Sequence, residues 1–166
     1  MRFLGIDPGL RLTGYGCVDL LDHLAEPVLV EGGVLRLNPR DSLPARLADL
    51  DRDLTTVMEE LNPDRLVVEQ VFSQAHRART AILMGHARGV ILLAGGRRGL
   101  PVDEFAATEV KRAVTGHGHA TKSQVQASVA RQLGLEQVPD PPDVADAIAL
   151  AICAARRNMQ LTSTEP

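Results

Sequence analysis

The sequence predicts an α/β domain, built as a mixed five-stranded sheet flanked by helices on both faces. Within the first 37 residues, three short apolar segments are separated by brief turns, which is typical of an antiparallel meander. After residue 42, segments of helical periodicity alternate with apolar segments, which is typical of helices that connect strands. The last helical segment is apolar on nearly every side, so it requires burial against the sheet.

The size and composition indicate one soluble domain. The chain has 166 residues, enough to bury a core, and we expect residues 1–158 to form one domain and residues 159–166 a disordered tail. No segment reaches transmembrane length and no signal-peptide pattern is present, so we expect no membrane association. Cys17 and Cys153 lie in apolar segments without metal-ligand spacing. They indicate buried thiols in a reducing compartment, and hence a cytoplasmic protein.

The meander accounts for the first three strands. We expect them at 2–7, 13–18 and 28–37, with antiparallel pairing because their connections are short. The pair Gly32-Gly33 inside the third segment suggests a β-bulge there.

The first helix and the fourth strand follow directly. One face of the segment 43–61 carries apolar residues at alternating steps of four and three, and Ser42 is a candidate N-cap. This face predicts packing on the parent sheet, with a coiled coil to a partner as the alternative. Asn62-Pro63-Asp64 ends the helix, and the segment 65–72 predicts the fourth strand.

A second helix is expected at about 75–94. Its stripe contains small residues, Gly85 and Gly89 among them, together with Ala78, Ile82 and Leu92. Small residues allow a second backbone to approach closely. The stripe therefore predicts either tight packing on its own sheet or the seam of a homodimer.

The remaining elements complete the α/β pattern. We expect a fifth strand at 101–105, a short helix at 107–114 and a final helix at 143–156. Between them, Thr121 and Gln124 have the spacing of a capping box at the start of a further helix.

The distribution of charge is more informative than its total of −3. Residues 1–70 contain 7 Lys/Arg and 13 Asp/Glu, residues 71–132 contain 9 and 3, and residues 133–166 contain 2 and 5, which gives −6, +6 and −3. From Val71 to Val102 there is no acidic residue. This asymmetry suggests a polyanionic partner, although a solvated basic helix face is the simpler explanation.

Asp7 is the first candidate functional residue. It ends an apolar segment that Pro8-Gly9 stops at once, so its carboxylate is expected at the carboxyl end of a buried strand, a usual place for functional groups in α/β sheets. A carboxylate that only hydrogen-bonds its own turn is the alternative.

Three further carboxylates stand out. Glu69 lies in a segment that otherwise requires burial, where an ionised group is costly without a partner. Asp143 and Asp146 are spaced i, i+3 on one face at the start of the last helix. Taken singly, Asp143 could be an N-cap and Asp146 could gain only from the helix dipole.

Together the four carboxylates predict a metal centre. Two end strands and two begin a buried helix that can pack beside them, and no Cys or His spacing accompanies them. Such a donor set favours Mg²⁺ or Mn²⁺ and suits two-metal hydrolysis of a phosphodiester. The residues by themselves therefore predict a metal-dependent nuclease or phosphotransferase.

Five motifs, in order and at matching spacing from Phe3 to about Ala155, closely resemble the RuvC family of crossover junction endodeoxyribonucleases. They are Gly5-Ile6-Asp7-Pro8-Gly9 with Thr13-Gly14-Tyr15-Gly16, Glu69-Gln70-Val71-Phe72, Ala87-Arg88-Gly89-Val90, Lys122-Ser123-Gln124-Val125-Gln126 and Asp143-Val144-Ala145-Asp146-Ala147. The resemblance implies a ribonuclease H-like fold and a homodimer. It also implies a Holliday junction resolvase of recombination and repair, which makes paired nicks in four-way junction DNA with two Mg²⁺ ions per site, for which Mn²⁺ can substitute. RuvA and RuvB are its implied partners.

The resemblance also assigns roles to residues. Asp7, Glu69, Asp143 and Asp146 match the metal-binding catalytic acids. Lys111 and Lys122 match basic residues that assist at the cleaved phosphate, and Phe72 matches an aromatic placed against junction bases. Phe72 could equally be a core residue. Where family members often carry Lys-Asn, this chain has Ala75-His76-Arg77, and Arg77 and Arg79 are the candidates for DNA contacts there.

Three other hypotheses are weaker. A sugar-kinase or actin-like ATPase begins with a similar strand and turn but needs two such domains. A non-catalytic junction-binding module would lack one of the four carboxylates, and all four are present. A related resolvase-like nuclease acting on structured RNA is the main alternative.

Overall fold

The computed structural model describes residues 1–70 and 78–162, with side chains in the second range from Thr80 onward. It contains the strands β1 (Arg2–Asp7), β2 (Leu12–Asp19), β3 (Val28–Arg36), β4 (Arg65–Glu69) and β5 (Val102–Phe105). The helices are α1 (Leu43–Leu61), α2 (Ala78–Arg97), α3 (Ala107–Thr115), α4 (Lys122–Gln132) and α5 (Pro142–Thr162).

The strands form one mixed sheet in the order β3-β2-β1-β4-β5. The meander β1-β2-β3 is antiparallel, whereas β4 and β5 run parallel to β1, which confirms the predicted mixed sheet. β1, β3 and β4 therefore end, and β2 begins, at the same end of the sheet. We call this the site end.

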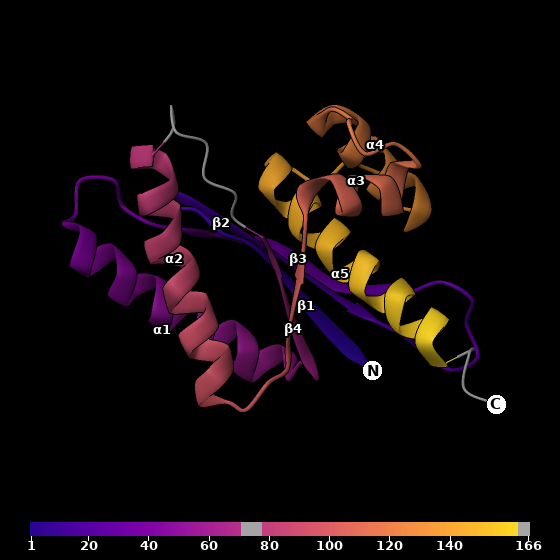
Figure 1. Ribbon diagram of the computed structural model, residues 1–166, viewed down its shortest axis with the longest axis horizontal. Helices are drawn as coiled ribbons and strands as arrows, with labels where there is room; N and C mark the ends of the chain where they lie inside the picture. Colours follow the sequence, from indigo (N-terminus) through magenta and orange to yellow (C-terminus); the bar gives the residue numbers. More distant parts are fainter. Residues whose placement is uncertain (71–77, 163–166) are drawn as a thin grey trace.

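Helices cover both faces of the sheet, as predicted (Figure 1). Alternate residues of β1 divide between two cores because side chains alternate along a strand. Leu4 and Ile6 belong to the core under α1 and α2, while Phe3 belongs to the core under α3, α4 and α5. The predicted stripe of α1 packs on its own sheet, with Leu50 and Leu54 fully buried. No helix in the described ranges is both long and apolar enough to cross a membrane.

The structure confirms the predicted N-caps of α1 and α4. The Ser42 hydroxyl accepts a hydrogen bond from the Ala45 amide and caps α1. Thr121 and Gln124 form the complete capping box of α4, so this helix begins at Lys122. The position of Lys122 is thus fixed by the local sequence.

Two predictions need correction. The irregularity of β3 lies opposite Cys17 and Val18, where Val30 is the extra residue, while Gly32 and Gly33 pair regularly with β2. At the C-terminus, α5 continues to Thr162, into the segment 159–166 that we expected to be disordered. The Thr162 hydroxyl hydrogen-bonds the carbonyls of Asn158 and Met159 in this last turn.

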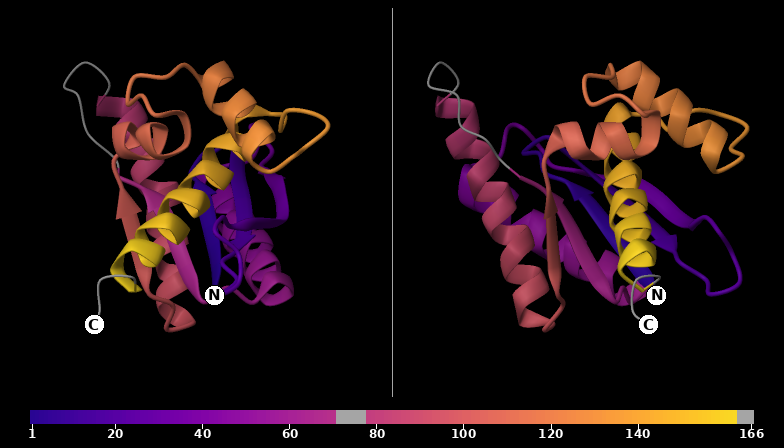
Figure 2. Two further views of the ribbon diagram at one scale, coloured as in Figure 1. Left: turned by 90° about the vertical axis from the view of Figure 1, so that its right-hand side faces the viewer. Right: turned by 45° about the vertical axis from the view of Figure 1, so that its right-hand side comes forward.

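α5 crosses the sheet diagonally and lies directly on β1 and β2 (Figure 2). Glycines make this close contact possible. A Cβ on Gly5 would lie 2.1 Å from the carbonyl oxygen of Ala147, and one on Gly14 would lie 2.0 Å from that of Asp143. Both positions therefore require glycine, and the contact brings the first turns of α5 to the site end of the sheet.

Candidate active site

Asp7 is the last residue of β1, at the centre of the site end. The turn after it is fixed by Thr13, which is fully buried. Its hydroxyl donates to the Gly9 carbonyl at 2.7 Å and accepts from the Gly9 amide at 3.2 Å. This pair of hydrogen bonds holds the Pro8-Gly9 turn. Asp7 lines the two hollows at the end of the sheet, and no hydrogen bond between its carboxylate and this turn is present among the described residues.

Glu69 is the last residue of β4, the strand next to β1. Arg88 of α2 supports this strand end. Its guanidinium donates to the Glu69 carbonyl at 3.4 Å and forms an ion pair with Glu104 at 2.6 Å. The backbone of Glu69 is thereby tied to α2 and β5, which leaves the side chain to face the site.

Asp143 and Asp146 come from the beginning of α5, as predicted. Asp143 is the second residue of the helix and not its N-cap, and its carbonyl lies against Gly14 of β2. The spacing of three residues places Asp146 on the same side of the helix. Helix packing on the glycines thus delivers both carboxylates to the strand ends.

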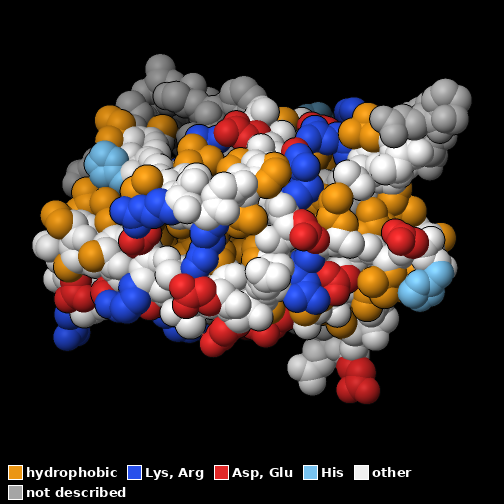
Figure 3. Space-filling model, turned by 90° about the horizontal axis from the view of Figure 1, so that it is seen from below, with side chains coloured by type: hydrophobic (Ala, Val, Ile, Leu, Met, Phe, Trp, Pro, Cys, Tyr) orange, Lys and Arg blue, Asp and Glu red, His pale blue; other side chains and the backbone are white. Residues whose placement is uncertain are grey.

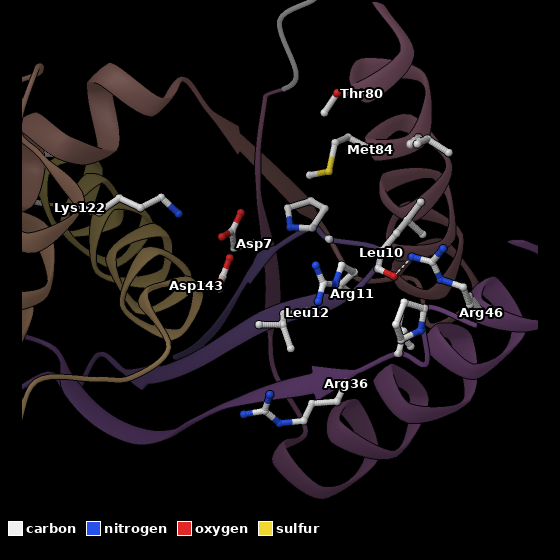
Figure 4. A pocket seen from close by; sticks show the side chains of 15 residues that line it. Asp7, Leu10, Arg11, Leu12, Arg36, Arg46, Thr80, Met84, Lys122 and Asp143 are labelled. Atoms are coloured by element: carbon white, nitrogen blue, oxygen red, sulfur yellow. Dashed lines mark hydrogen bonds between the residues drawn. The ribbon is translucent and has the colours of Figure 1, made fainter. Parts of the chain in front are cut away.

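Two hollows share the site residues. A cavity of about 210 Å³ is lined by both lysines and three of the acids, namely Asp7, Glu69, Asp146, Lys111 and Lys122. An adjoining open groove of about 910 Å³ is also lined by Asp7 and Lys122, together with Asp143. In Figure 4 the Lys122 side chain points from α4 toward Asp7 and Asp143. The structure therefore brings together all four predicted acids and both predicted lysines.

The carboxylates are close enough to perturb one another. Burial, reinforced by the negative charges of Asp146, Glu69 and Asp143, raises the pKa of Asp7 to about 8, although Lys122 opposes the shift. Burial and the charge of Asp146 raise the pKa of Glu69, against the effect of Lys111 and Lys122. The site thus holds more negative charge than its own lysines neutralise.

Lys122 is the cation in direct contact with the acids. Its ammonium lies 3.0 Å from the Asp146 carboxylate, and its side chain remains 60% exposed. Burial lowers its pKa, but the hydrogen bond to Asp146 and the charges of Asp146, Asp7 and Asp143 outweigh this and raise it. Lys122 is therefore a permanent cation that can face a phosphate from the solvent side.

The chemistry of this site fits a divalent metal ion. Among the residues that the structure describes, the two hollows are lined by four carboxylates and by neither Cys nor His, which is the donor set of Mg²⁺ and Mn²⁺. The pKa of Asp7 is raised because this carboxyl group is buried beside other carboxylates, and a bound cation would compensate their negative charge. Within the described ranges, no three His, Cys, Asp or Glu side chains already enclose a point where an ion could sit. The site therefore has the donors of a metal centre without its closed arrangement.

Three predicted DNA-contact residues lie wholly or partly outside the described structure, and two supporting residues were not predicted. Phe72 and Arg77 lie outside the described residues, as does the side chain of Arg79. The supporting roles of Thr13 and Arg88 were not predicted. Thr13 is a polar residue within a buried strand, and Arg88 is the single Lys or Arg of the apolar segment 80–96, and either feature could have indicated them.

Comparison with known proteins agrees with the site. The family model for the crossover junction endodeoxyribonuclease RuvC matches residues 3–154. The RuvC of Salinispora arenicola is 49% identical over 154 residues, covering 92% of this chain and 86% of the relative. The RuvC of Rhodopirellula baltica is 47% identical over 150 residues, covering 90% and 83%.

A solved structure gives the same result. T. thermophilus RuvC in complex with a Holliday junction substrate superposes with a TM-score of 0.86 at 32% identity, covering 96% of each chain. This match extends over the whole sheet and its flanking helices, and it confirms the predicted ribonuclease H-like fold. The chain belongs to the RuvC family of crossover junction endodeoxyribonucleases.

Proposed function

We propose that this protein is a Holliday junction resolvase, which cuts four-way DNA junctions by paired symmetric nicks. The observation that carries the proposal is the convergence of Asp7, Glu69, Asp143 and Asp146 with Lys111 and Lys122 at one end of the sheet. Membership of the RuvC family supplies the substrate class. The comparisons lend no support to the alternative of a nuclease for structured RNA.

The four carboxylates would hold two Mg²⁺ ions, with Mn²⁺ as a substitute. When bound, such ions supply an activated water and stabilise the leaving 3′ oxygen. Asp7 and Glu69 contribute from rigid strand ends, while Asp143 and Asp146 contribute from one helix. Because these acids come from three elements of one packed core, their relative positions are set before the substrate arrives.

Lys122 would contact the phosphate beside the cleavage point. At the N-terminus of α4, its ammonium and the positive end of the helix dipole both favour an anion. Lys111 would add positive charge from α3 on the Glu69 side of the same cavity. The lysines thus offset the repulsion between the acids and the DNA.

Replacement of Lys122 tests this role. We expect Lys122→Ala to slow junction cleavage about 10- to 100-fold. It should also reduce the slope of the logarithm of the binding constant against the logarithm of salt concentration by about one unit, the value for one phosphate contact. The measurements are single-turnover cleavage and junction binding at salt concentrations from about 50 to about 200 mM. Arg52→Ala, which removes an exposed arginine of α1, is the matched control. An unchanged salt slope for Lys122→Ala would exclude the phosphate contact.

The protein is proposed to act as a homodimer that joins through α2. Most of the predicted stripe that the structure describes does not pack on the sheet. Ile82 is 61% exposed and a Cβ on Gly85 or Gly89 would meet no atom within 4 Å, whereas Leu92 is half-buried. Leu93, next to the stripe, is 51% exposed. A second copy of α2 could approach these glycines closely, and a two-fold dimer presents two identical sites to two like strands.

We expect Ile82→Glu to convert the dimer into a monomer, because it places a charge in the apolar centre of the seam. The monomer should nick single strands without pairing the cuts. Sedimentation gives the assembly state, and a cruciform plasmid distinguishes a nicked circle from a linear product. Val138→Glu, at a residue that is 51% exposed in the loop before α5, is the control and should remain dimeric. A dimeric Ile82→Glu protein would place the interface elsewhere.

The function itself is tested with synthetic substrates. A four-way junction with each strand labelled in turn is incubated with Mg²⁺, with Mn²⁺ and with a chelator, beside linear duplex DNA and a structured RNA. We expect symmetric nicks in two opposing strands of the junction only when metal is present. Preferential cutting of the RNA, or cuts without symmetry, would contradict the proposal. The partnership with RuvA and RuvB rests on the family alone and is tested by co-purification on junction DNA.

A further inference from the structure

The open groove beside the carboxylates extends well past them. From Asp7 it continues over the turn between β1 and β2 to the end of β3 and the start of α1. Its floor carries three arginines, Arg11, Arg36 and Arg46, and its far wall is the apolar pair Leu83 and Met84 of α2. Figure 4 shows Arg11 and Arg36 on the floor of this groove, on the opposite side of Asp7 from Lys122.

Strand register explains why the arginines lie there. Leu12 of β2 pairs with Arg36 of β3, and the Leu37 amide donates to the Arg11 carbonyl at 2.9 Å. Arg11, directly before β2, and Arg36, the last residue of β3, are thus neighbours at the site end. Across this end the order of charges is Glu69 on β4, Asp7 on β1, Arg11 directly before β2 and Arg36 at the end of β3.

Arg11 and Arg36 differ from the arginines at the opposite end of the sheet. There, Arg2 pairs with Asp19 at 2.8 Å and Arg65 with Asp103 at 2.7 Å. Figure 3, which views the molecule from that end, shows basic and acidic side chains side by side. Arg11 and Arg36 are exposed, and neither side chain has a hydrogen bond or ion pair in the part of the chain that the structure describes.

Arg46 has a supporting role in the same groove. Its guanidinium donates to the carbonyl of Leu10, which lies in the turn between Asp7 and Arg11. Its Nε is buried and has no partner among the described residues. Arg46 therefore fixes the turn that carries Arg11 and adds a third positive charge to the floor.

We propose that Arg11 and Arg36 bind the backbone of the cleaved DNA strand on the side of the cut away from Lys122. The proposal rests on the proposed function and adds the path of the strand. Two strand spacings of about 4.8 Å separate the β1 and β3 ends, about 10 Å in all. At about 3.4 Å of helix rise per phosphate of one strand, this corresponds to about three nucleotides. Guanidinium groups match phosphates in geometry, and Leu83 and Met84 face the sugars and bases.

A neutral phosphate in the substrate tests the contact. Single methylphosphonates are placed at each of the three positions on either side of the cut, and single-turnover cleavage is compared for wild type and Arg11→Ala/Arg36→Ala. We expect one or two positions on one side at which the neutral group slows wild type about tenfold, as loss of a charged hydrogen bond should. At those positions the double variant, already slower on unmodified DNA, should lose nothing further.

Controls separate this proposal from the proposed function and from folding. Cleavage of the unmodified junction by wild type tests the function independently. Both arginines are exposed, so the Tm of the double variant should stay within about 2 °C of that of wild type. Arg11→Lys/Arg36→Lys should restore part of the rate, and Arg52→Ala should keep the wild-type pattern. Equal slowing of wild type and the double variant at every position would overturn the proposal. A change of oligomeric state with an unaltered methylphosphonate pattern would also overturn it, and would assign the groove to a second copy of the chain.

Discussion

Asp7→Asn should abolish junction cleavage, with a loss of at least about a thousandfold. Asp7 lies at the centre of the carboxylate cluster and lines both hollows of the site. Loss of a metal ligand there removes several kcal/mol of transition-state stabilisation, and each 1.36 kcal/mol corresponds to tenfold in rate. Junction binding in the absence of metal should persist, because the lysines and arginines are unchanged. Single-turnover cleavage and a mobility-shift assay measure the two effects.

The same substitution should stabilise the metal-free protein at neutral pH. The folded pKa of Asp7, about 8, lies above its ordinary value of 3.8. Between these values the folded state binds more protons than the unfolded state, so stability of the wild type falls as pH rises from about 4 to about 8. Asp7→Asn removes this dependence. Near the upper end of the range, we expect a gain of at least about 1 kcal/mol, which is about 2–4 °C in Tm.

Metal should reverse the order of stability. Saturating Mg²⁺ should stabilise the wild type by mass action and stabilise Asp7→Asn less. Thermal unfolding with chelator and with Mg²⁺, at about pH 5 and about pH 8, gives four values of Tm for each protein. Asp22→Asn, which removes an exposed carboxylate between β2 and β3, is the matched control and should cut and unfold like wild type. A variant Asp7→Asn that still cuts in Mg²⁺ would refute the assignment of this residue.

Gly14→Ala should cause the second large effect. The new Cβ would lie 2.0 Å from the carbonyl oxygen and 2.4 Å from the carbonyl carbon of Asp143, so β2 and α5 must separate. Because the clash involves backbone on both sides, we expect a loss of about 3 kcal/mol of stability or more. A displacement of about 1 Å also moves two of the proposed metal-binding acids and should slow cleavage about a hundredfold.

Two comparisons make this result specific. Gly96→Ala, in the last turn of α2 where a Cβ meets nothing within 4 Å, should be neutral or slightly stabilising. If Gly14→Ala proves too unstable to assay at 37 °C, cleavage at lower temperature, where the variant is folded by circular dichroism, isolates the effect on the site. Wild-type activity and stability for Gly14→Ala would mean that α5 does not lie on β2 as described.

Local sequence patterns predict much of this fold. The meander, the helix stripe over Leu50 and Leu54, and the capping box at Thr121 each depend on residues close in sequence, and the structure confirms them. The position of the irregularity in β3 was wrong because a bulge depends on pairing register with β2, which the glycines alone do not specify.

The candidate site divides in the same way. Carboxylates at strand ends and at a helix start are visible as charges where burial is expected, so Asp7, Glu69, Asp143 and Asp146 could be predicted. The polar Thr13 within a buried strand and the charge of Arg88 within an apolar segment are visible in the sequence, but their bonds to the backbone of Gly9 and Glu69 are not. Arg11 and Arg36 become neighbours only through the register of β2 with β3. Such relations need the folded structure.

The central claim is that metal ions held by these four acids contact the phosphate that is cut. The most direct measurement replaces a non-bridging oxygen of that phosphate with sulfur and compares cleavage in Mg²⁺ with cleavage in Mn²⁺, which accepts sulfur more readily. We expect one of the two sulfur isomers to slow cleavage at least about tenfold in Mg²⁺, and Mn²⁺ to restore most of the rate. Cleavage that is insensitive to sulfur and proceeds equally well with a chelator would contradict the claim.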